Sequence, residues 1–108
     1  MDESLNCCSG PGYSSPKEAI KAPREKIVYT VCIYSGTGIK KPDYLATIDV
    51  DEKSSTYGNV IHRTEIGNEG DELHHMGWNA CSSCNSDSNM ERKYLIIPGV
   101  RSSNFYIV

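Results

Sequence analysis

The segment from Asp71 to Cys84 concentrates the side chains best suited to metal or thiol chemistry. It holds two of the three histidines and two of the five cysteines of the sequence within 14 residues. Neutral imidazole suits copper, zinc, iron or nickel, and thiolates add a preference for soft ions. The combination therefore favours copper or zinc over calcium or magnesium.

The histidine pair, His74 and His75, constrains how such an ion could be held. Adjacent residues of a strand point to opposite faces of the sheet. Both rings can therefore grip one ion only where the backbone bulges or turns. If the pair holds an ion, the favoured geometry has one ring as the ligand and the other beside it. The alternative is a polar pair at a strand end, hydrogen-bonded to Asp71 or Glu72.

The thiol pair, Cys81 and Cys84, has CxxC spacing. This spacing lets two thiolates reach one soft ion or close a small disulfide, and it can lower the pKa of one thiol. Structural zinc normally requires a second ligand pair at finger-like spacing, which Cys7, Cys8 and Cys32 do not supply. The pair could hold Cu(I), selenium or a redox bridge, or could simply pack in a loop.

The remaining histidine and cysteines favour structural interpretations. Cys7 and Cys8 are interpreted as two loosely packed thiols, Cys32 as a core residue in mid-strand, and His62 as a hydrogen-bonded strand residue. The sequence contains no phosphate-binding glycine loop, nucleophile elbow or zinc-protease motif.

Length, charge and hydropathy narrow the class of protein. The 108 residues leave room for one small domain, and the interspersed charges, with a net charge of −3, offer no basic surface for nucleic acid. The amino terminus lacks the cationic start and apolar core of a signal peptide. No stretch approaches the roughly 20 apolar residues of a membrane span. We expect an intracellular protein with reduced thiols and neither an integral membrane segment nor a nucleic-acid partner.

The pattern of elements predicts an all-β fold. Residues 1–25 are expected to form an extended leader with Pro and Gly turns, including one short helical turn that begins at Ser15 and Pro16. Further along, Val, Ile and Tyr favour strands, and no helix of normal length is expected. The expected strands are 26–34, 43–51, 58–66, 73–78, 94–97 and 104–108, with a loop over 79–90. Short strands joined by turns predict an antiparallel meander.

Three long motifs carry a family resemblance. They are CSGPGY at residues 8–13, PDYLATIDVD at residues 42–51 and DELHHMGWNACSSC at residues 71–84. These motifs, in order and without large gaps, resemble the start of selenium-binding proteins of the methanethiol oxidase family. The resemblance implies that residues 26–108 form the first one to two blades of a β-propeller that is incomplete in this chain.

The resemblance also implies an activity and a compartment. Family methanethiol oxidases convert methanethiol, O₂ and water into formaldehyde, hydrogen sulfide and hydrogen peroxide, and they depend on copper held by histidines. His74 and His75 match a histidine pair of that pattern, as catalytic and metal-binding residues. Cys81 and Cys84 match the family CxxC, a candidate site for selenium or another soft ion. The implied location is the cytoplasm, with nuclear and peripheral membrane pools as further locations.

Two departures from the family pattern limit how far the roles of family residues apply to this chain. Some members have a selenium-associated cysteine just before the third strand, where this sequence has Tyr57 and Gly58. The remaining histidine ligands of a propeller centre would come from later blades. We therefore expect the 108 residues to be a partial chain, inactive alone and prone to aggregate through open strand edges. The competing hypotheses are a selenium or soft-ion transport module without turnover, and an inactive truncated product.

Overall fold

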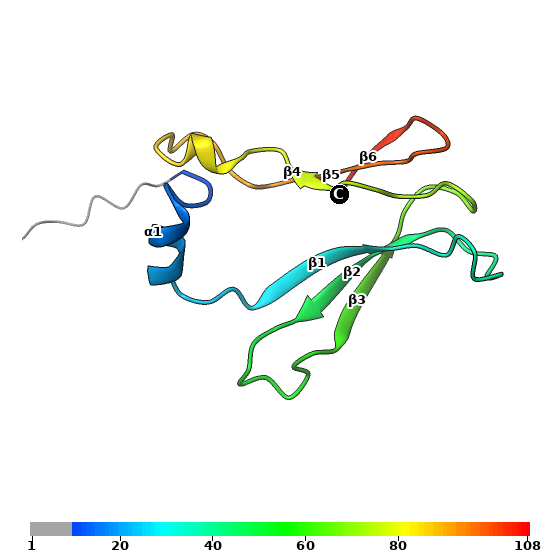
Figure 1. Cartoon of the computed structure of the whole chain (residues 1–108), viewed down its shortest axis with the longest axis horizontal. Helices are drawn as coiled ribbons and strands as arrows, with labels where there is room; N and C mark the ends of the chain where they lie inside the picture. Colours follow the sequence, from blue (N-terminus) through cyan, green and yellow to red (C-terminus); the bar gives the residue numbers. More distant parts are fainter. Residues whose placement is uncertain (1–9) are drawn as a thin grey trace, which may run out of the picture. The chain divides into compact units, whose positions relative to one another are not determined.

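The computed structural model describes residues 10–108, and Figure 1 shows their helices and strands. The expectations for Cys7 and Cys8 lie outside the described residues. Contacts divide the described residues into two compact units, one made of residues 10–23 and 78–95, the other of residues 24–77 and 96–108.

Short strands dominate the described residues, as the sequence predicts. The elements are α1 (Pro16–Lys21), β1 (Ile27–Cys32), β2 (Tyr44–Asp49), β3 (Val60–Glu65), β4 (Gly77–Trp78), the 3₁₀ turn η1 (Ser82–Cys84), β5 (Leu95–Pro98) and β6 (Phe105–Ile107). The predicted helical turn is confirmed: Ser15 is its N-cap and accepts a hydrogen bond from the Glu18 N–H at 3.2 Å. Proline at the first helical position suits its start.

The first sheet has the antiparallel order β1-β2-β3. Its central strand β2 carries the core, because Leu45 and Ala46 are 2% and 0% exposed although they point to opposite faces. The register between β2 and β3 shifts between Thr47 and Ile48, as at a β-bulge. The adjacent strands β1 and β3 are more exposed than β2.

The second sheet has the order β4-β5-β6, with β5 and β6 antiparallel. The boundary between the two units falls within β4 and β5. The strand predicted over residues 73–78 is wrong in its middle. Leu73 forms an isolated β-bridge with Gly99, and β4 covers the last two residues, but residues 74–76 belong to no strand. The cause is His75, whose φ of 44° lies in the left-handed region and interrupts an extended backbone.

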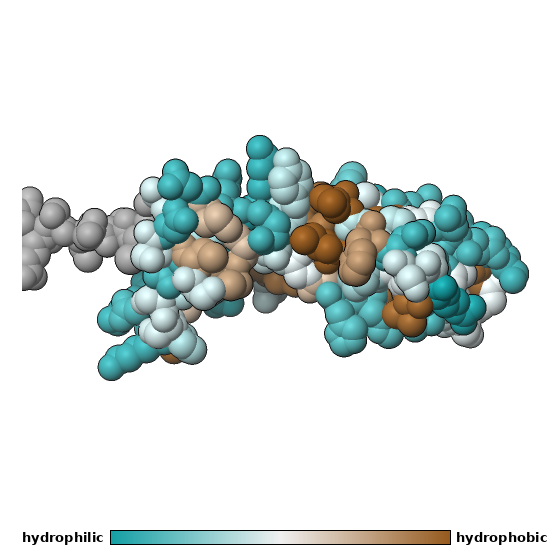
Figure 2. Space-filling model, turned by 90° about the horizontal axis from the view of Figure 1, so that it is seen from above, coloured by the Kyte–Doolittle hydropathy of each residue, from teal (hydrophilic) through white to brown (hydrophobic). Residues whose placement is uncertain are grey.

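Much apolar surface remains open. The side chains of Phe105 and Ile107 on β6 are 73% and 70% exposed, and Figure 2 shows apolar side chains open on the face in view. Within residues 10–108, no helix has the length and hydropathy that a membrane crossing requires.

Candidate metal and thiol site

The histidine segment is held by backbone pairing to the turn after β5. The His74 N–H donates to the Pro98 carbonyl at 3.0 Å, and the Val100 N–H donates to the Glu72 carbonyl at 2.8 Å. Between these two bonds, Leu73 is fully buried. The backbone on both sides of the histidine pair is therefore fixed by neighbours 24 to 28 residues away in sequence, as the residue numbers of these pairs give.

The buried carboxylate of Asp43 anchors the same segment from the other side. Its two oxygens accept the N–H of Tyr34 at 2.8 Å and the N–H of Leu73 at 3.1 Å. Its backbone carbonyl accepts the N–H of Ile66 at 2.9 Å. Asp43 is 4% exposed, and these bonds satisfy a group that would be costly to bury alone. Sequence reasoning missed this positioning role, because the partners lie 9 and 30 residues away.

A second carboxylate, Asp71, closes the turn between β5 and β6. It accepts the Ser102 N–H at 3.1 Å, the Ser102 hydroxyl at 2.6 Å and the Tyr106 hydroxyl. The Ser102 and Tyr106 hydroxyl bonds hold the pKa of Asp71 below its ordinary value of 3.8. A Cβ added at the buried Gly99 would come inside contact distance of this carboxylate. The turn thus requires glycine at that position.

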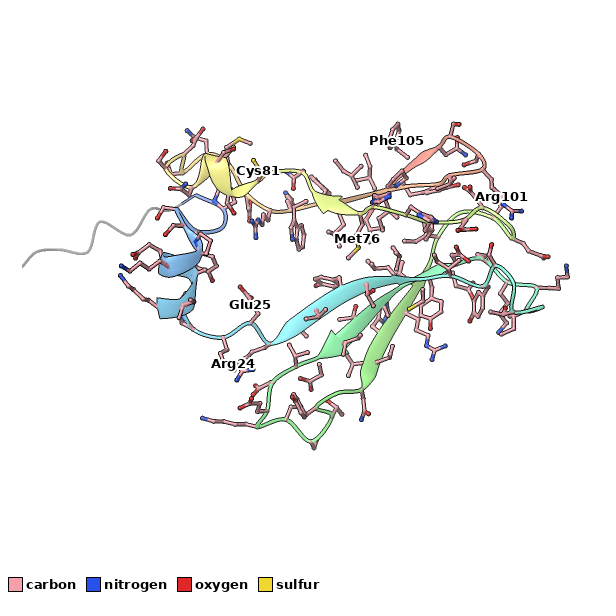
Figure 3. The ribbon with its side chains drawn as sticks, in the orientation of Figure 1. Arg24, Glu25, Met76, Cys81, Arg101 and Phe105 are labelled. Carbon is pink, nitrogen blue, oxygen red and sulfur yellow. The ribbon has the colours of Figure 1, made fainter. Side chains whose placement is uncertain are left out.

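The two imidazoles lie near each other in spite of being adjacent in sequence. Their ring centroids are 5.7 Å apart, with an angle of 47° between the planes. The positive φ of His75 is the backbone turn that such an approach requires. A left-handed non-glycine residue is strained and is over-represented at functional sites. Figure 3 labels Met76, which follows the pair directly before β4.

Glu72 orients the first ring. The distance from Glu72 Oε1 to His74 Nε2 is 2.7 Å. This bond, followed by one from the Ser35 hydroxyl, holds the pKa of Glu72 below its ordinary value of 4.5. An ionised carboxylate only accepts hydrogen bonds. In its neutral form His74 would donate from Nε2 to this carboxylate and keep the lone pair of Nδ1, as in the carboxylate–histidine arrangements that support metal ligands.

The two imidazoles are donors of the type that a soft or borderline ion prefers, but they are too few to complete a metal site. Bonds from imidazole nitrogen to metal are about 2.0–2.1 Å, so rings with centroids 5.7 Å apart can reach one ion. Two imidazoles suit copper or zinc. Within residues 10–108, however, no group of three or more His, Cys, Asp or Glu side chains is placed to hold a metal. The described residues therefore do not offer a complete coordination sphere by themselves.

The thiol pair lies on the turn that follows β4, where Figure 3 labels Cys81. Cys81 is exposed, Cys84 is half-buried, and both are free thiols. The Cys81 sulfur lies 2.7 Å from the Ser83 hydroxyl oxygen. This bond and the Ser83 backbone N–H lower the pKa of Cys81 from its ordinary value of 9.0. The Cys81 thiol is therefore ionised more readily than an ordinary cysteine thiol.

Residues of the amino-terminal segment support this turn. The Gly10 N–H donates to the Asn85 carbonyl at 3.1 Å, and a Cβ at Gly10 would collide with the Cys84 carbonyl. Across the turn, Arg92 donates to the Ser82 hydroxyl at 3.1 Å. Sequence reasoning missed the contact between Gly10 and the cysteine turn. A glycine beside a proline signals a turn but does not say what the turn touches.

The two pairs of candidate residues belong to different units, the histidines to residues 24–77 and the cysteines to residues 78–95. Different sets of contacts therefore position them. His62 lies on the exposed strand β3, as predicted for a strand residue. Cys32 is half-buried opposite Tyr44 rather than in the core.

Comparisons with known proteins identify the family. The model of the "56kDa selenium binding protein (SBP56)" family matches residues 7–108. Selenium-binding protein 2 of Arabidopsis thaliana is 53% identical over 98% of this chain and 22% of its own length. Methanethiol oxidase of Xenopus laevis is 62% identical over 92% of this chain and 21% of its own length.

A solved structure agrees with these sequence comparisons. The X-ray structure of a hypothetical selenium-binding protein from Sulfolobus tokodaii superposes with a TM-score of 0.80 at 51% identity, and it covers 88% of this chain and 22% of that one. The chain belongs to the SBP56 family of selenium-binding proteins. It spans about a fifth of the length of the curated relatives that it matches.

Proposed function

We propose that this chain is the amino-terminal part of a protein that converts methanethiol, O₂ and water into formaldehyde, hydrogen sulfide and hydrogen peroxide. Several relatives are named methanethiol oxidase, at identities of 58% to 62%. Two three-stranded sheets support the proposal that residues 26–108 form the first one to two blades of a β-propeller. The proposed substrate is a small thiol, and the proposed location is the cytoplasm.

The observation that carries this proposal is the proximity of the two imidazoles, 5.7 Å between ring centroids. Three features orient them: the carboxylate of Glu72, the buried carboxylate of Asp43 and the left-handed backbone at His75. Left-handed residues of this kind cluster at ligand and catalytic sites, which supports a ligand role for the pair. We propose that His74 Nδ1 and one nitrogen of His75 are two ligands of a copper ion.

Copper bound here would supply the one-electron chemistry that O₂ activation requires. The role of the chain's own residues is to position it. Glu72 fixes the His74 tautomer by accepting its Nε2 proton, and Asp43 fixes the backbone beside it. The remaining ligands would come from outside the described residues, since none of these completes a group of three.

The test exchanges both ligands in the full-length natural protein. The double variant His74→Ala/His75→Ala should lose bound copper, measured by elemental analysis, together with peroxide release from methanethiol. The matched control is His62→Ala, which removes an exposed imidazole on β3 and should leave both unchanged. Retained copper and retained turnover in the double variant would contradict the proposal.

A second candidate function is selenium or soft-ion binding without turnover, and the exposed, acidified thiol of Cys81 favours it. Its neighbour Cys84 lies three residues on in the same 3₁₀ turn. Two such thiols can hold one soft ion or pass sulfur or selenium between them. In this hypothesis the cysteines, rather than the histidines, carry the function.

One double variant, compared with the unmodified protein, separates the two functions. With selenite and glutathione supplied, Cys81→Ser/Cys84→Ser should retain copper and lose bound selenium if the thiols are the selenium site. Peroxide release with methanethiol in the unmodified protein then decides whether turnover occurs. If selenium retention is unaffected by the cysteine exchanges, the second function is wrong.

A further inference from the structure

The loop between β1 and β2 forms a pocket that the proposed oxidase chemistry does not use. Its volume is about 290 Å³, and its walls come from residues 34–43, from Glu69 and Gly70, and from Arg101. All of these belong to one unit. The volume is at the lower end of the range for small-molecule sites, so any ligand would be small.

The charges of the side chains that line the pocket indicate the charge of a ligand that it could bind. Three cations, Lys40, Lys41 and Arg101, face two carboxylates, although the whole chain has a net charge of −3. Of these three cations, only Lys40 forms an ion pair within residues 10–108, a loose one with Glu69 at 3.8 Å. Neither Lys41 nor Arg101 forms an ion pair within residues 10–108, although the charge of Arg101 also acts on the Glu72 carboxylate and helps to lower its pKa.

The carboxylates of the pocket are already occupied. Both oxygens of Asp43 accept backbone N–H groups, and the Glu69 carboxylate is the one that pairs with Lys40. A cationic ligand would therefore find its natural partners engaged. An anion would instead meet Lys41, and Arg101 whose charge it would share with Glu72.

The frame that carries these cations is held in place. The backbone N–H groups of Arg101 and Ser102 bond to Asp71, and Figure 3 labels Arg101 on the turn between β5 and β6. On the opposite wall, Gly36 and Gly38 both have a φ of 77°, and a Cβ added to either would meet nothing within 4 Å. A ligand could thus approach the backbone of the loop closely.

We infer that this pocket binds a small oxyanion, such as a sulfate, phosphate or carboxylate group, between Lys41 and Arg101. Guanidinium matches such groups in a bidentate manner and ammonium acts as a point charge. The pocket adjoins the histidine site, because Ser35 lines the pocket and also bonds to Glu72. The inference does not depend on the proposed oxidase activity.

The experiment measures binding of radiolabelled inorganic sulfate to the full-length natural protein by equilibrium dialysis, at constant ionic strength set with potassium chloride. One sulfate per chain is expected. Lys41→Gln and Arg101→Gln should each weaken its affinity about tenfold, the loss of about 1.4 kcal/mol of binding. The matched control Lys53→Gln removes an exposed lysine outside the pocket and should change nothing. Competition with phosphate and with acetate then distinguishes a dianion from a carboxylate as the preferred group.

Two further variants keep the inference falsifiable. Arg101→Lys retains the charge, so it should bind sulfate more tightly than Arg101→Gln. His74→Ala/His75→Ala should still bind sulfate, which separates failure of this site from failure of the proposed oxidase. Absence of sulfate, phosphate and acetate binding, or equal weakening by Lys53→Gln, would overturn the inference.

Discussion

The histidine segment and the cysteine turn are contiguous in sequence and are supported in different ways. Buried Asp43 and the network around Asp71 hold the histidine segment. The cysteine turn rests on exposed hydrogen bonds, such as those of Ser83 and Arg92. The histidine segment is thus held by buried bonds and has a fixed backbone, whereas the turn keeps an exposed thiol.

The largest expected effect comes from breaking the anchor of the histidine segment. Asp43→Asn places an amide donor opposite one of two backbone N–H groups in a buried site. The free energy of unfolding should fall by about 2–3 kcal/mol, measured by denaturant unfolding of the full-length protein, and copper content should fall with it. Asp87→Asn, on the exposed loop after Cys84, is the control and should be near neutral. Equal stability of both variants would show that Asp43 anchors nothing.

A smaller loss is expected where Gly99 meets Asp71. Gly99→Ala puts a methyl group against that carboxylate, and overpacking of this kind costs about 1–3 kcal/mol. Gly70→Ala is the control for replacing a glycine without a collision, because nothing lies within 4 Å of a Cβ added there. The φ of 81° at Gly70 makes this alanine strained as well. Thermal unfolding should rank Gly99→Ala as the less stable protein, and the reverse order would argue against the packed turn.

The stability of the turn between β5 and β6, which Asp71 closes, should depend on pH. The folded pKa of Asp71 lies below its ordinary value of 3.8, so its stabilisation is present above that value and is lost as the pH falls through the lower folded pKa. Hydrogen-exchange protection of residues 99–106 should therefore fall between about pH 5 and about pH 2. Asp71→Asn should flatten this dependence. An unchanged profile in the variant would contradict the role given to the carboxylate.

The smallest effect is expected at the cysteine turn. Ser83→Ala removes the main cause of the lowered pKa of Cys81, so less thiolate should be present near neutral pH. Alkylation of Cys81 by iodoacetamide, followed by mass spectrometry, should slow by about twofold or more at pH 7. Ser86→Ala on the same loop is the control. If both variants react at the unmodified rate, Ser83 does not activate the thiol.

The sequence predicted the class of fold better than the details of the site. Strands rich in Val, Ile and Tyr and the Ser15–Pro16 helix start depend on local preferences, and both are present in the structure. The expected strand over residues 73–78 is interrupted, because tertiary contacts hold His75 in a conformation that local preference disfavours.

The candidate site shows the same limit. Sequence reasoning allowed a hydrogen bond from the histidines to Asp71 or Glu72, and the structure selects Glu72. The anchoring by Asp43 and the support of the cysteine turn by Gly10 could not be predicted, because both depend on partners far away in the sequence. Family motifs located the residues, and only the fold shows what holds them.

The most direct test of the metal-site proposal is pulsed electron paramagnetic resonance of the copper-loaded full-length protein. Modulation from the remote nitrogen of coordinated imidazole should weaken in both His74→Ala and His75→Ala, and should persist in His62→Ala. Because Glu72 occupies His74 Nε2, Glu72→Gln should alter the remote-nitrogen couplings while copper remains bound. Identical imidazole modulation in all the variants would show that the pair lies outside the copper site.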